Sequence, residues 1–179
     1  MSSSLIIKLR KKTEKVDDAP AILILTTTPT RELYNEIDFV YDGGRSMFMT
    51  EEQEKELESS EHYKEYGDYT VLTLNKLNEI ISFYDDKIKQ FNDYIKKEYD
   101  QKCMIQEAFH NNGKIELLNE ITERENSIAS LQEELDEYKE LRNKWEYSVK
   151  QVFIEANNLF DLDNLDGSKL KYELIYYCD

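Results

Sequence analysis

The stretch LNKLNEIISFYDDKIKQFNDYI, residues 74–95, decides the fold. Its apolar residues lie alternately three and four positions apart, which is the heptad spacing of a helix that packs along a second helix. The row consists of Leu74, Leu77, Ile81, Tyr84, Ile88, Phe91 and Ile95. We therefore expect a long helix here, with a partner helix covering its apolar row.

A second row with the same spacing follows the helix-stop sequence Asn111-Asn112-Gly113. Two of its positions, Arg124 and Arg142, are charged, and polar residues in such rows usually fix the register. We expect both arginines to pair with glutamates of the first helix. The full row is Leu117, Ile121, Arg124, Ile128, Leu131, Leu135, Tyr138, Arg142, Trp145, Val149, Val152, Ala156 and Leu159.

The two rows match in register. If the chain folds back on itself near Gly113, the numbers of facing residues must have a nearly constant sum. Leu74 with Val149 gives 223, and the six following pairs, down to Ile95 with Ile128, give 222 or 223. The sequence therefore predicts an antiparallel coiled-coil hairpin over residues 70–160, with its hinge at 111–113. Parallel dimerisation through one of the helices is the alternative.

The chain ends have the sequence features of β-strands. Residues 5–10, 21–28 and 170–178 are rich in β-branched and aromatic side chains, and residues 37–41 and 46–49 flank a glycine turn. A C-terminal strand needs neighbours to bury its face, so we expect it to join the N-terminal strands. The predicted fold class is α+β: a small, mostly antiparallel sheet formed by both chain ends, with the coiled-coil helical hairpin inserted.

This pattern divides the chain into three parts. Residues 1–50 plus 168–179 form the β-sheet head, residues 51–69 an acidic helical linker, and residues 70–160 the hairpin. Four apolar residues near the base of the hairpin lie outside the heptad rows, and we expect them to pack on the sheet. They are Phe83, Tyr147, Phe153 and Ile154.

The net charge narrows the class of partner. The 179 residues include 38 acidic and 23 basic side chains, a formal charge of −15, which argues against direct DNA or RNA binding. We interpret the acid-rich segments as a surface that docks on a basic protein or competes with nucleic acid. A solvated helix face is the simpler alternative. The acidic surface consists of Glu51, Glu52, Glu54, Glu56, Glu58, Glu133, Glu134 and Glu137.

Apolar residues also gather around the hinge, far along the chain from the predicted strands. An apolar end on a long helical arm indicates either partner binding or self-association, with local packing as the alternative. The predicted partner-binding residues are Met104, Ile105, Phe109, Ile115 and Leu118.

Catalytic and metal-binding patterns are weak in this sequence. His62 and His110 fall at opposite ends of the predicted hairpin, so they do not share a site. Residues 162–173 resemble a calcium loop in spacing, but Leu162 occupies the first ligand position and cannot coordinate. Polar residues at 26–28 and 42–45 are most simply a strand end and a turn. We expect no catalytic residues, metal or cofactor.

The expected setting is a reducing cytoplasm, because two cysteines occur without an export signal or an apolar run long enough to span a membrane. The abundance of Lys, Ile, Tyr and Asn, whose codons are A/T-rich, suggests a phage or mobile element.

The expected function is a non-catalytic, acidic protein-binding protein, with no direct contact to nucleic acid or membrane. The specific hypothesis is a phage or mobile-element inhibitor of a host nucleic-acid enzyme or defence complex, whose partner is a basic nucleic-acid-binding enzyme. Two alternatives come from other classes. One is a structural or assembly protein that forms homo-oligomers through its hairpin, and the other is a small enzyme with a pocket beside the sheet.

Overall fold

The computed structural model of the protein describes residues 4–15, 18–25, 55, 70–159 and 169–178. The chain divides into two compact units. The sheet unit comprises Met1–Ile81 and Asn143–Asp179, and the hairpin unit comprises Ser82–Arg142. The predicted hairpin of residues 37–49 and the acidic linker lie outside the described residues, apart from Lys55.

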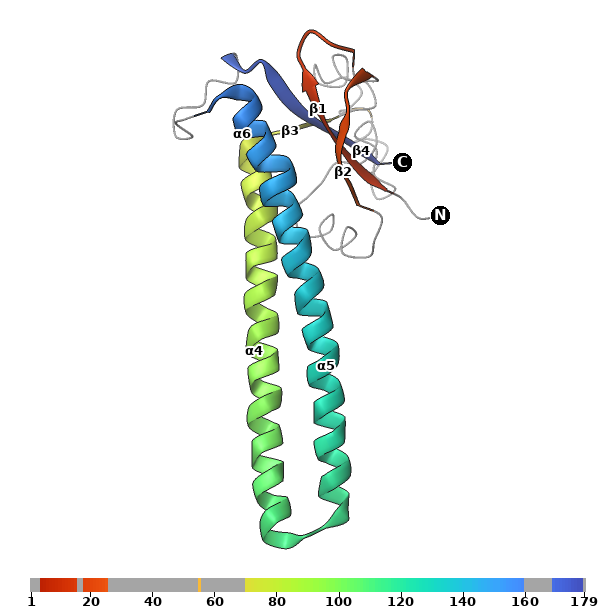
Figure 1. Cartoon of the computed structure of the whole chain (residues 1–179), viewed down its shortest axis with the longest axis vertical. Coiled ribbons are helices and arrows are strands. Elements are labelled where there is room, and N and C mark those ends of the chain that lie inside the picture. The colour runs from red at the N-terminus through yellow and green to blue at the C-terminus, as the bar shows by residue number, and fades with distance from the viewer. Residues whose placement is uncertain (1–3, 16–17, 26–54, 56–69, 160–168, 179) are drawn as a thin grey trace. The chain divides into compact units, whose positions relative to one another are not determined.

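The sheet contains β1 (Leu5–Lys11), β2 (Ala21–Leu25), β3 (Thr70–Leu72) and β4 (Tyr172–Cys178), in the order β2-β1-β4-β3 (Figure 1). All three pairings are antiparallel. Strand β1 pairs with β4 over its full length, from Leu5 opposite Cys178 to Lys11 opposite Tyr172. This confirms the predicted α+β class and the sheet built from both chain ends. Strand β3, which directly precedes the first long helix, was not predicted.

One face of the sheet is a continuous apolar surface. Alternate residues of the strands point to the same side, and on this side the side chains are buried. They are Leu5, Ile7, Leu23, Leu25, Leu72 and Leu174. On the opposite side, Ile175 is fully buried and Glu173 is only 5% exposed. Burying the Glu173 carboxylate requires a partner. Arg10, its cross-strand neighbour, supplies one, since Arg10 Nε donates to Glu173 Oε1 at 2.7 Å.

The helical part of the sheet unit includes a π-helix over Lys144–Lys150 and α6 over Gln151–Asn157. The π-helix contacts β2, and α6 contacts β4. Two hydrogen bonds of the Asn157 side chain join the end of α6 to β4. Its Oδ1 accepts the backbone N–H of Tyr172 at 2.9 Å, and its Nδ2 donates to the Tyr172 carbonyl at 3.1 Å.

The π-helix changes which residues are buried. The expected 3-4 spacing placed Arg142 and Val152 in the apolar row, but the structure buries Leu141 and Phe153 instead. A π-helix has more residues per turn than an α-helix, so side chains four positions apart stay on one side through this segment. Trp145, Val149 and Phe153 are spaced in this way, and all three are buried.

One expectation about the base of the hairpin needs revision. Phe153 is buried in the sheet unit as predicted, but Tyr147 is 65% exposed, so the prediction that it packs on the sheet was wrong. Tyr147 lies two positions from Trp145 and Val149, and neighbours at that distance do not share a helix face.

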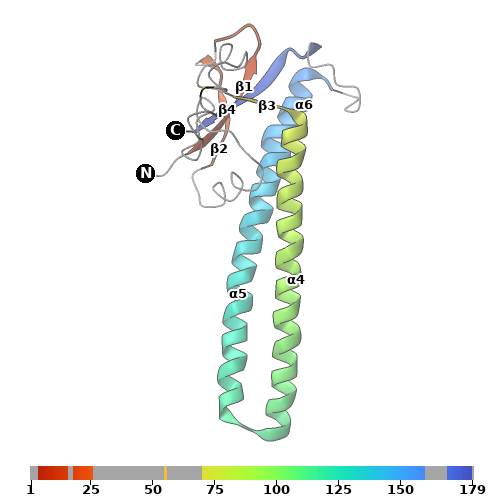
Figure 2. The same ribbon diagram turned by 180° about the vertical axis from the view of Figure 1, so that it is seen from behind.

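The hairpin is formed by α4 (Leu74–Asn112) and α5 (Ile115–Asn143), which run side by side in both views (Figures 1 and 2). Helix α4 begins where the Thr73 hydroxyl accepts the backbone N–H of Lys76 at 3.2 Å. It ends at the predicted hinge, where Gly113 has φ +61° and donates its N–H to the Phe109 carbonyl at 2.7 Å.

The core of the hairpin unit confirms the predicted register. Ile95, Ile128 and Leu135 are buried in one cluster, and Ile88, Phe91 and Leu131 pack against it. The Tyr84 and Tyr138 rings, another predicted pair, are 6.2 Å apart. Phe91 and Tyr138 add a second ring contact at 5.2 Å. Three predicted layers thus lie in one continuous apolar core.

The charged residues near this core pair across the helices. Arg124 Nη1 lies 2.9 Å from Glu98 Oε2, which confirms the predicted glutamate partner. Arg142 pairs instead with an aspartate, at 3.0 Å from Nε to Asp85 Oδ1. The prediction of a glutamate was wrong here because Leu141 takes the buried position and Arg142 turns toward the side of the hairpin.

Candidate protein-binding surface

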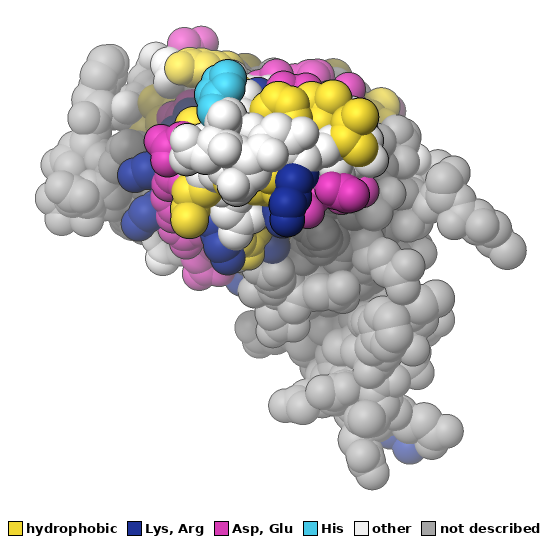
Figure 3. All heavy atoms as spheres, turned by 90° about the horizontal axis from the view of Figure 1, so that it is seen from below, with side chains coloured by type: hydrophobic (Ala, Val, Ile, Leu, Met, Phe, Trp, Pro, Cys, Tyr) yellow, Lys and Arg dark blue, Asp and Glu magenta, His cyan; other side chains and the backbone are white. Residues whose placement is uncertain are grey.

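Exposed apolar side chains in the hairpin unit concentrate near the hinge. All of the large ones lie within residues 94–118, which we call the tip: Tyr94, Tyr99, Met104, Ile115 and Leu118, with exposed fractions of 46–74%. Viewed from this end, hydrophobic side chains form much of the described surface (Figure 3). Apolar patches of this kind usually mark interaction sites.

The five predicted partner-binding residues divide into two groups. Met104, Ile115 and Leu118 are exposed, whereas Ile105 and Phe109 are half-buried. Phe109 contributes to the structure of the tip, because its carbonyl accepts the Gly113 N–H that closes the helix and its ring lies 6.4 Å from that of His110. We therefore keep the first three as candidate contacts.

The register of the hairpin also specifies what lies on each side of the tip. In an α-helix, successive residues advance by about 100°, so residues three, four and seven apart share a side. With facing residues summing to about 222, Tyr99 lies level with Thr122, Cys103 with Leu118, and Gln106 with Ile115. These six residues form what we call the uncharged flank. All six are exposed, and none carries a formal charge.

The opposite side of the tip is different. The same register places Gln101 level with Glu120, and Glu116 lies one turn of α5 from Glu120 on this side. Met104 lies about 100° further round α4 than Cys103 and so is outside the uncharged flank. The tip therefore presents one uncharged and one acidic side.

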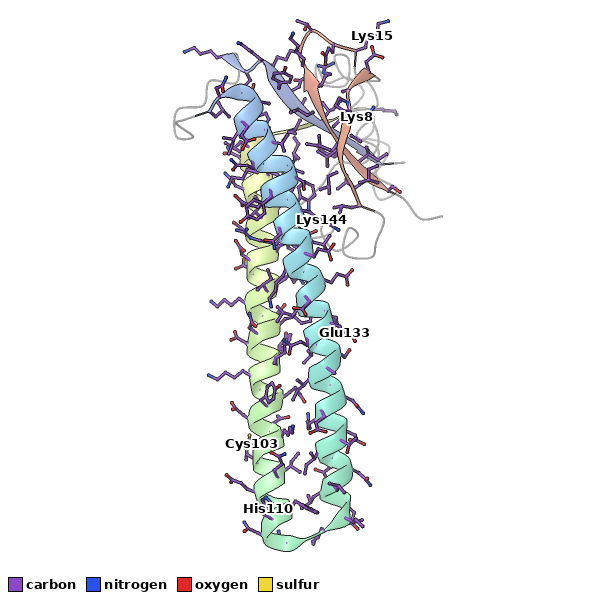
Figure 4. The ribbon with its side chains drawn as sticks, viewed as in Figure 1. Lys8, Lys15, Cys103, His110, Glu133 and Lys144 are labelled. Atoms are coloured by element: carbon purple, nitrogen blue, oxygen red, sulfur yellow. The ribbon has the colours of Figure 1, made fainter. Side chains whose placement is uncertain are left out.

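Tyr99, Cys103, Thr122 and Gln106 were not among the predicted contacts. In the sequence these residues also recur every three or four positions, in a row next to the heptad row of each helix. That row identifies a surface only once it is known which residues of the two helices face each other. Figure 4 shows Cys103 on α4 in the lower part of the hairpin, with His110 nearer the hinge.

The acidic surface is described only in part. Glu133, Glu134 and Glu137 are exposed on α5, and none of the three forms an ion pair with another described residue. Figure 4 labels Glu133. Over its 29 residues α5 carries nine acidic and three basic side chains, a net charge of 3 − 9 = −6. Over its 39 residues α4 carries seven and six, a net charge of 6 − 7 = −1. Glu51, Glu52, Glu54, Glu56 and Glu58 lie outside the described residues.

One ion pair borders the tip surface. Lys102 Nζ lies 2.7 Å from Glu125 Oε1, joining α4 to α5. The hydrogen bond that Lys102 donates to the Glu125 carboxylate raises the pKa of Lys102 above its ordinary value. This pair joins the two helices close to the uncharged flank.

The weaker sequence-based candidates do not assemble into a chemical site. His110 is exposed in the last turn of α4, and His62 lies outside the described residues. Glu173, the twelfth residue of the calcium-like segment, is bound to Arg10 in the sheet. Residues 26–28, 42–45 and 160–168 are not described. Within the described ranges, no group of three His, Cys, Asp or Glu side chains is placed to hold a metal ion.

Comparison with protein-family models, curated proteins and solved structures finds no match to this chain. Among the described helices, none combines the length and the apolar character needed to cross a membrane.

Proposed function

We propose that the protein is a non-catalytic protein-binding protein that holds its partner at the tip of the hairpin. One observation carries the proposal: every large exposed apolar side chain of the hairpin unit lies within residues 94–118. Since the rest of the two helices is closed by a buried core, these side chains are not needed to hold the hairpin together. They are available to a partner.

The charge of the chain supports a basic protein as the partner. A net charge of −15 and a charge of −6 on α5 attract basic surfaces and repel nucleic acid. A nucleic-acid enzyme or a defence complex has such a basic surface, which is why an inhibitor of phage or mobile-element origin remains the specific hypothesis. A cytoplasmic location accords with the exposed thiol of Cys103.

The proposal is tested by capture on the immobilised full chain from a lysate of the cells that express it. The binding variant is Met104→Glu/Ile115→Glu, and the matched control is Ile24→Glu/Tyr147→Glu, which adds the same two charges at apolar sites of the sheet unit that are 56% and 65% exposed. We expect one protein complex to be retained by the wild type and the control, and lost from the binding variant.

Two outcomes contradict the proposal. If the binding variant retains the same complex, the contact with the partner must lie outside the tip. A defined multimer in light scattering that dissociates in the binding variant would establish the assembly alternative, since the tip would then hold further copies of this chain.

A further inference from the structure

Resting on the proposed function, we infer that the uncharged flank binds an amphipathic helix of the partner, and that the apolar stripe of this helix is bordered by Lys and Arg. The flank comprises Tyr99, Cys103 and Gln106 of α4 and Ile115, Leu118 and Thr122 of α5. This names the chemistry of the partner and the side of the tip that it occupies.

A helix fits the dimensions of the flank. From Tyr99 to Gln106 the three layers span seven residues, or about 10 Å along α4. That length is two helical turns, which matches apolar anchors at positions i, i+3 or i+4, and i+7 of a helix laid along the hairpin. Each layer contains one large side chain, namely Tyr99, Leu118 or Ile115, beside a smaller or more flexible polar one. A third helix would therefore extend the two-helix packing at this end.

The border of the flank favours a basic helix. Asp100 and Glu107 lie beside it on α4, and neither forms an ion pair with another described residue, whereas Asn119 and Asn126 border it on α5. Lys96 lies at the end of the flank farther from the hinge, level with Glu125. Glu125 already forms an ion pair with Lys102. Carboxylates thus flank the α4 side of the uncharged surface, and Lys or Arg beside the partner's apolar stripe would reach them.

The same charges oppose a second copy of this chain as the occupant. Another copy would bring the same bordering carboxylates and the same net charge of −15 to the contact. Like charges across an interface lower affinity and suppress the wrong partner. The side of the tip with Glu116 and Glu120 is a poorer surface for an apolar stripe, because burying these carboxylates would cost free energy.

The test uses the full chain and two synthetic 18-residue helical peptides. Both peptides carry leucines at alternate spacings of three and four, and the residues beside the leucines are Lys in one peptide and Glu in the other. We expect the Lys peptide to bind with a Kd on the order of 10–100 μM, and the Glu peptide at least about tenfold more weakly. Calorimetry or fluorescence anisotropy at two salt concentrations measures both, and binding of the Lys peptide should weaken in higher salt.

Two variants locate the site. Leu118→Glu places a charge in the flank, and we expect it to weaken the Lys peptide by about tenfold or more. Ser130→Glu places the same charge at an exposed position on the other side of α5, and we expect a change of less than about twofold. Leu118 is half exposed in the first turn of α5, where a carboxylate suits the helix N-terminus, so the variant should fold. Circular dichroism checks this.

The inference is overturned if the wild type binds neither peptide, if both peptides bind equally, or if Ser130→Glu weakens binding as much as Leu118→Glu. A dimer of the wild type that Leu118→Glu dissociates would assign the flank to a second copy instead. The first three outcomes leave the proposed function untouched. It is tested by the capture experiment, which concerns the tip as a whole and does not depend on a partner helix.

Discussion

The middle and the tip of the hairpin use similar residues for different purposes. In the middle, Ile88 and Phe91 of α4, with Ile95 at the border of the tip, meet Ile128, Leu131 and Leu135 of α5 in one cluster, and the apolar surface is closed. At the tip, Tyr99, Met104, Ile115 and Leu118 leave about half or more of their side-chain surface open. The difference separates residues that stabilise the hairpin from residues available for binding. A substitution should therefore change stability in one region and affinity in the other.

The largest expected effect is in the middle. Leu135→Ala should lower the free energy of unfolding by about 3 kcal/mol, because it leaves a cavity between the helices where Leu135 is now 2% exposed. Leu118→Ala at the tip is the matched control and should cost less than about 0.5 kcal/mol. Urea denaturation of the full chain, followed by circular dichroism, measures both. Equal losses would remove the distinction between the two regions.

The hinge should show an intermediate effect. Gly113 has φ +61°, a left-handed conformation that alanine adopts with strain, although nothing lies within 4 Å of an added Cβ. Gly113→Ala should therefore lower stability by about 1 kcal/mol through the backbone alone. Lys114→Ala, one residue further on, is the control and should be close to neutral. A loss at Lys114 as large as at Gly113 would contradict this explanation of the hinge.

A smaller effect is expected for the ion pair that lies between the middle and the tip. Arg124 is 39% exposed and pairs with Glu98, so water and salt weaken their attraction. A double-mutant cycle with Arg124→Ala and Glu98→Ala should give a coupling free energy of about 0.5–1 kcal/mol that decreases in 0.5 M salt. Zero coupling at low salt would show that the contact does not fix the register.

The smallest effect on stability is expected at the tip itself. Ile115→Glu should change the free energy of unfolding by less than about 0.5 kcal/mol, because Ile115 is 74% exposed and a carboxylate is favourable in the first turn of a helix. Differential scanning calorimetry compares it with the wild type. A large drop in Tm would show that Ile115 holds the hairpin together.

Much of the hairpin could be predicted because several independent sequence features agree. The heptad rows, the Asn-Asn-Gly hinge and the matched residue sums all indicate the same register, and Ile95, Ile128 and Leu135 meet as expected. The pairing of β1 with β4 followed from simpler reasoning, since an apolar strand at the end of the chain must find a neighbour.

The base of the hairpin could not be predicted in the same way. Leu141 and Arg142 are adjacent, as are Val152 and Phe153. A shift of one residue in the helix therefore decides which member of each pair is buried. The alternating spacing of three and four predicted that Arg142 and Val152 are buried. Burying Leu141 and Phe153 instead removes a larger apolar area from water. The π-helix over Lys144–Lys150 accommodates that choice. Strand β3, at three residues, was too short for a periodic signal.

The candidate site was predicted in outline only. The apolar residues around the hinge could be identified, but their exposure depends on the turn geometry. Phe109 and Ile105 are half-buried, while Tyr99, which lies farther from the hinge on α4, is 48% exposed. The uncharged flank needs the position of both helices, because it combines residues 99–106 with residues 115–122.

The most direct test of the central claim attaches a photo-crosslinker to Cys103, which is exposed within the tip. The labelled protein is the full chain with Cys178→Ser, so that Cys103 is its single cysteine. The matched control adds Cys103→Ser and Tyr147→Cys to this variant, which moves the label to the sheet unit. Binding through the tip predicts that irradiation in lysate joins the chain to one protein from Cys103 and not from position 147. The same products from both positions, or cross-links from Cys103 only to other copies of this chain, would contradict it.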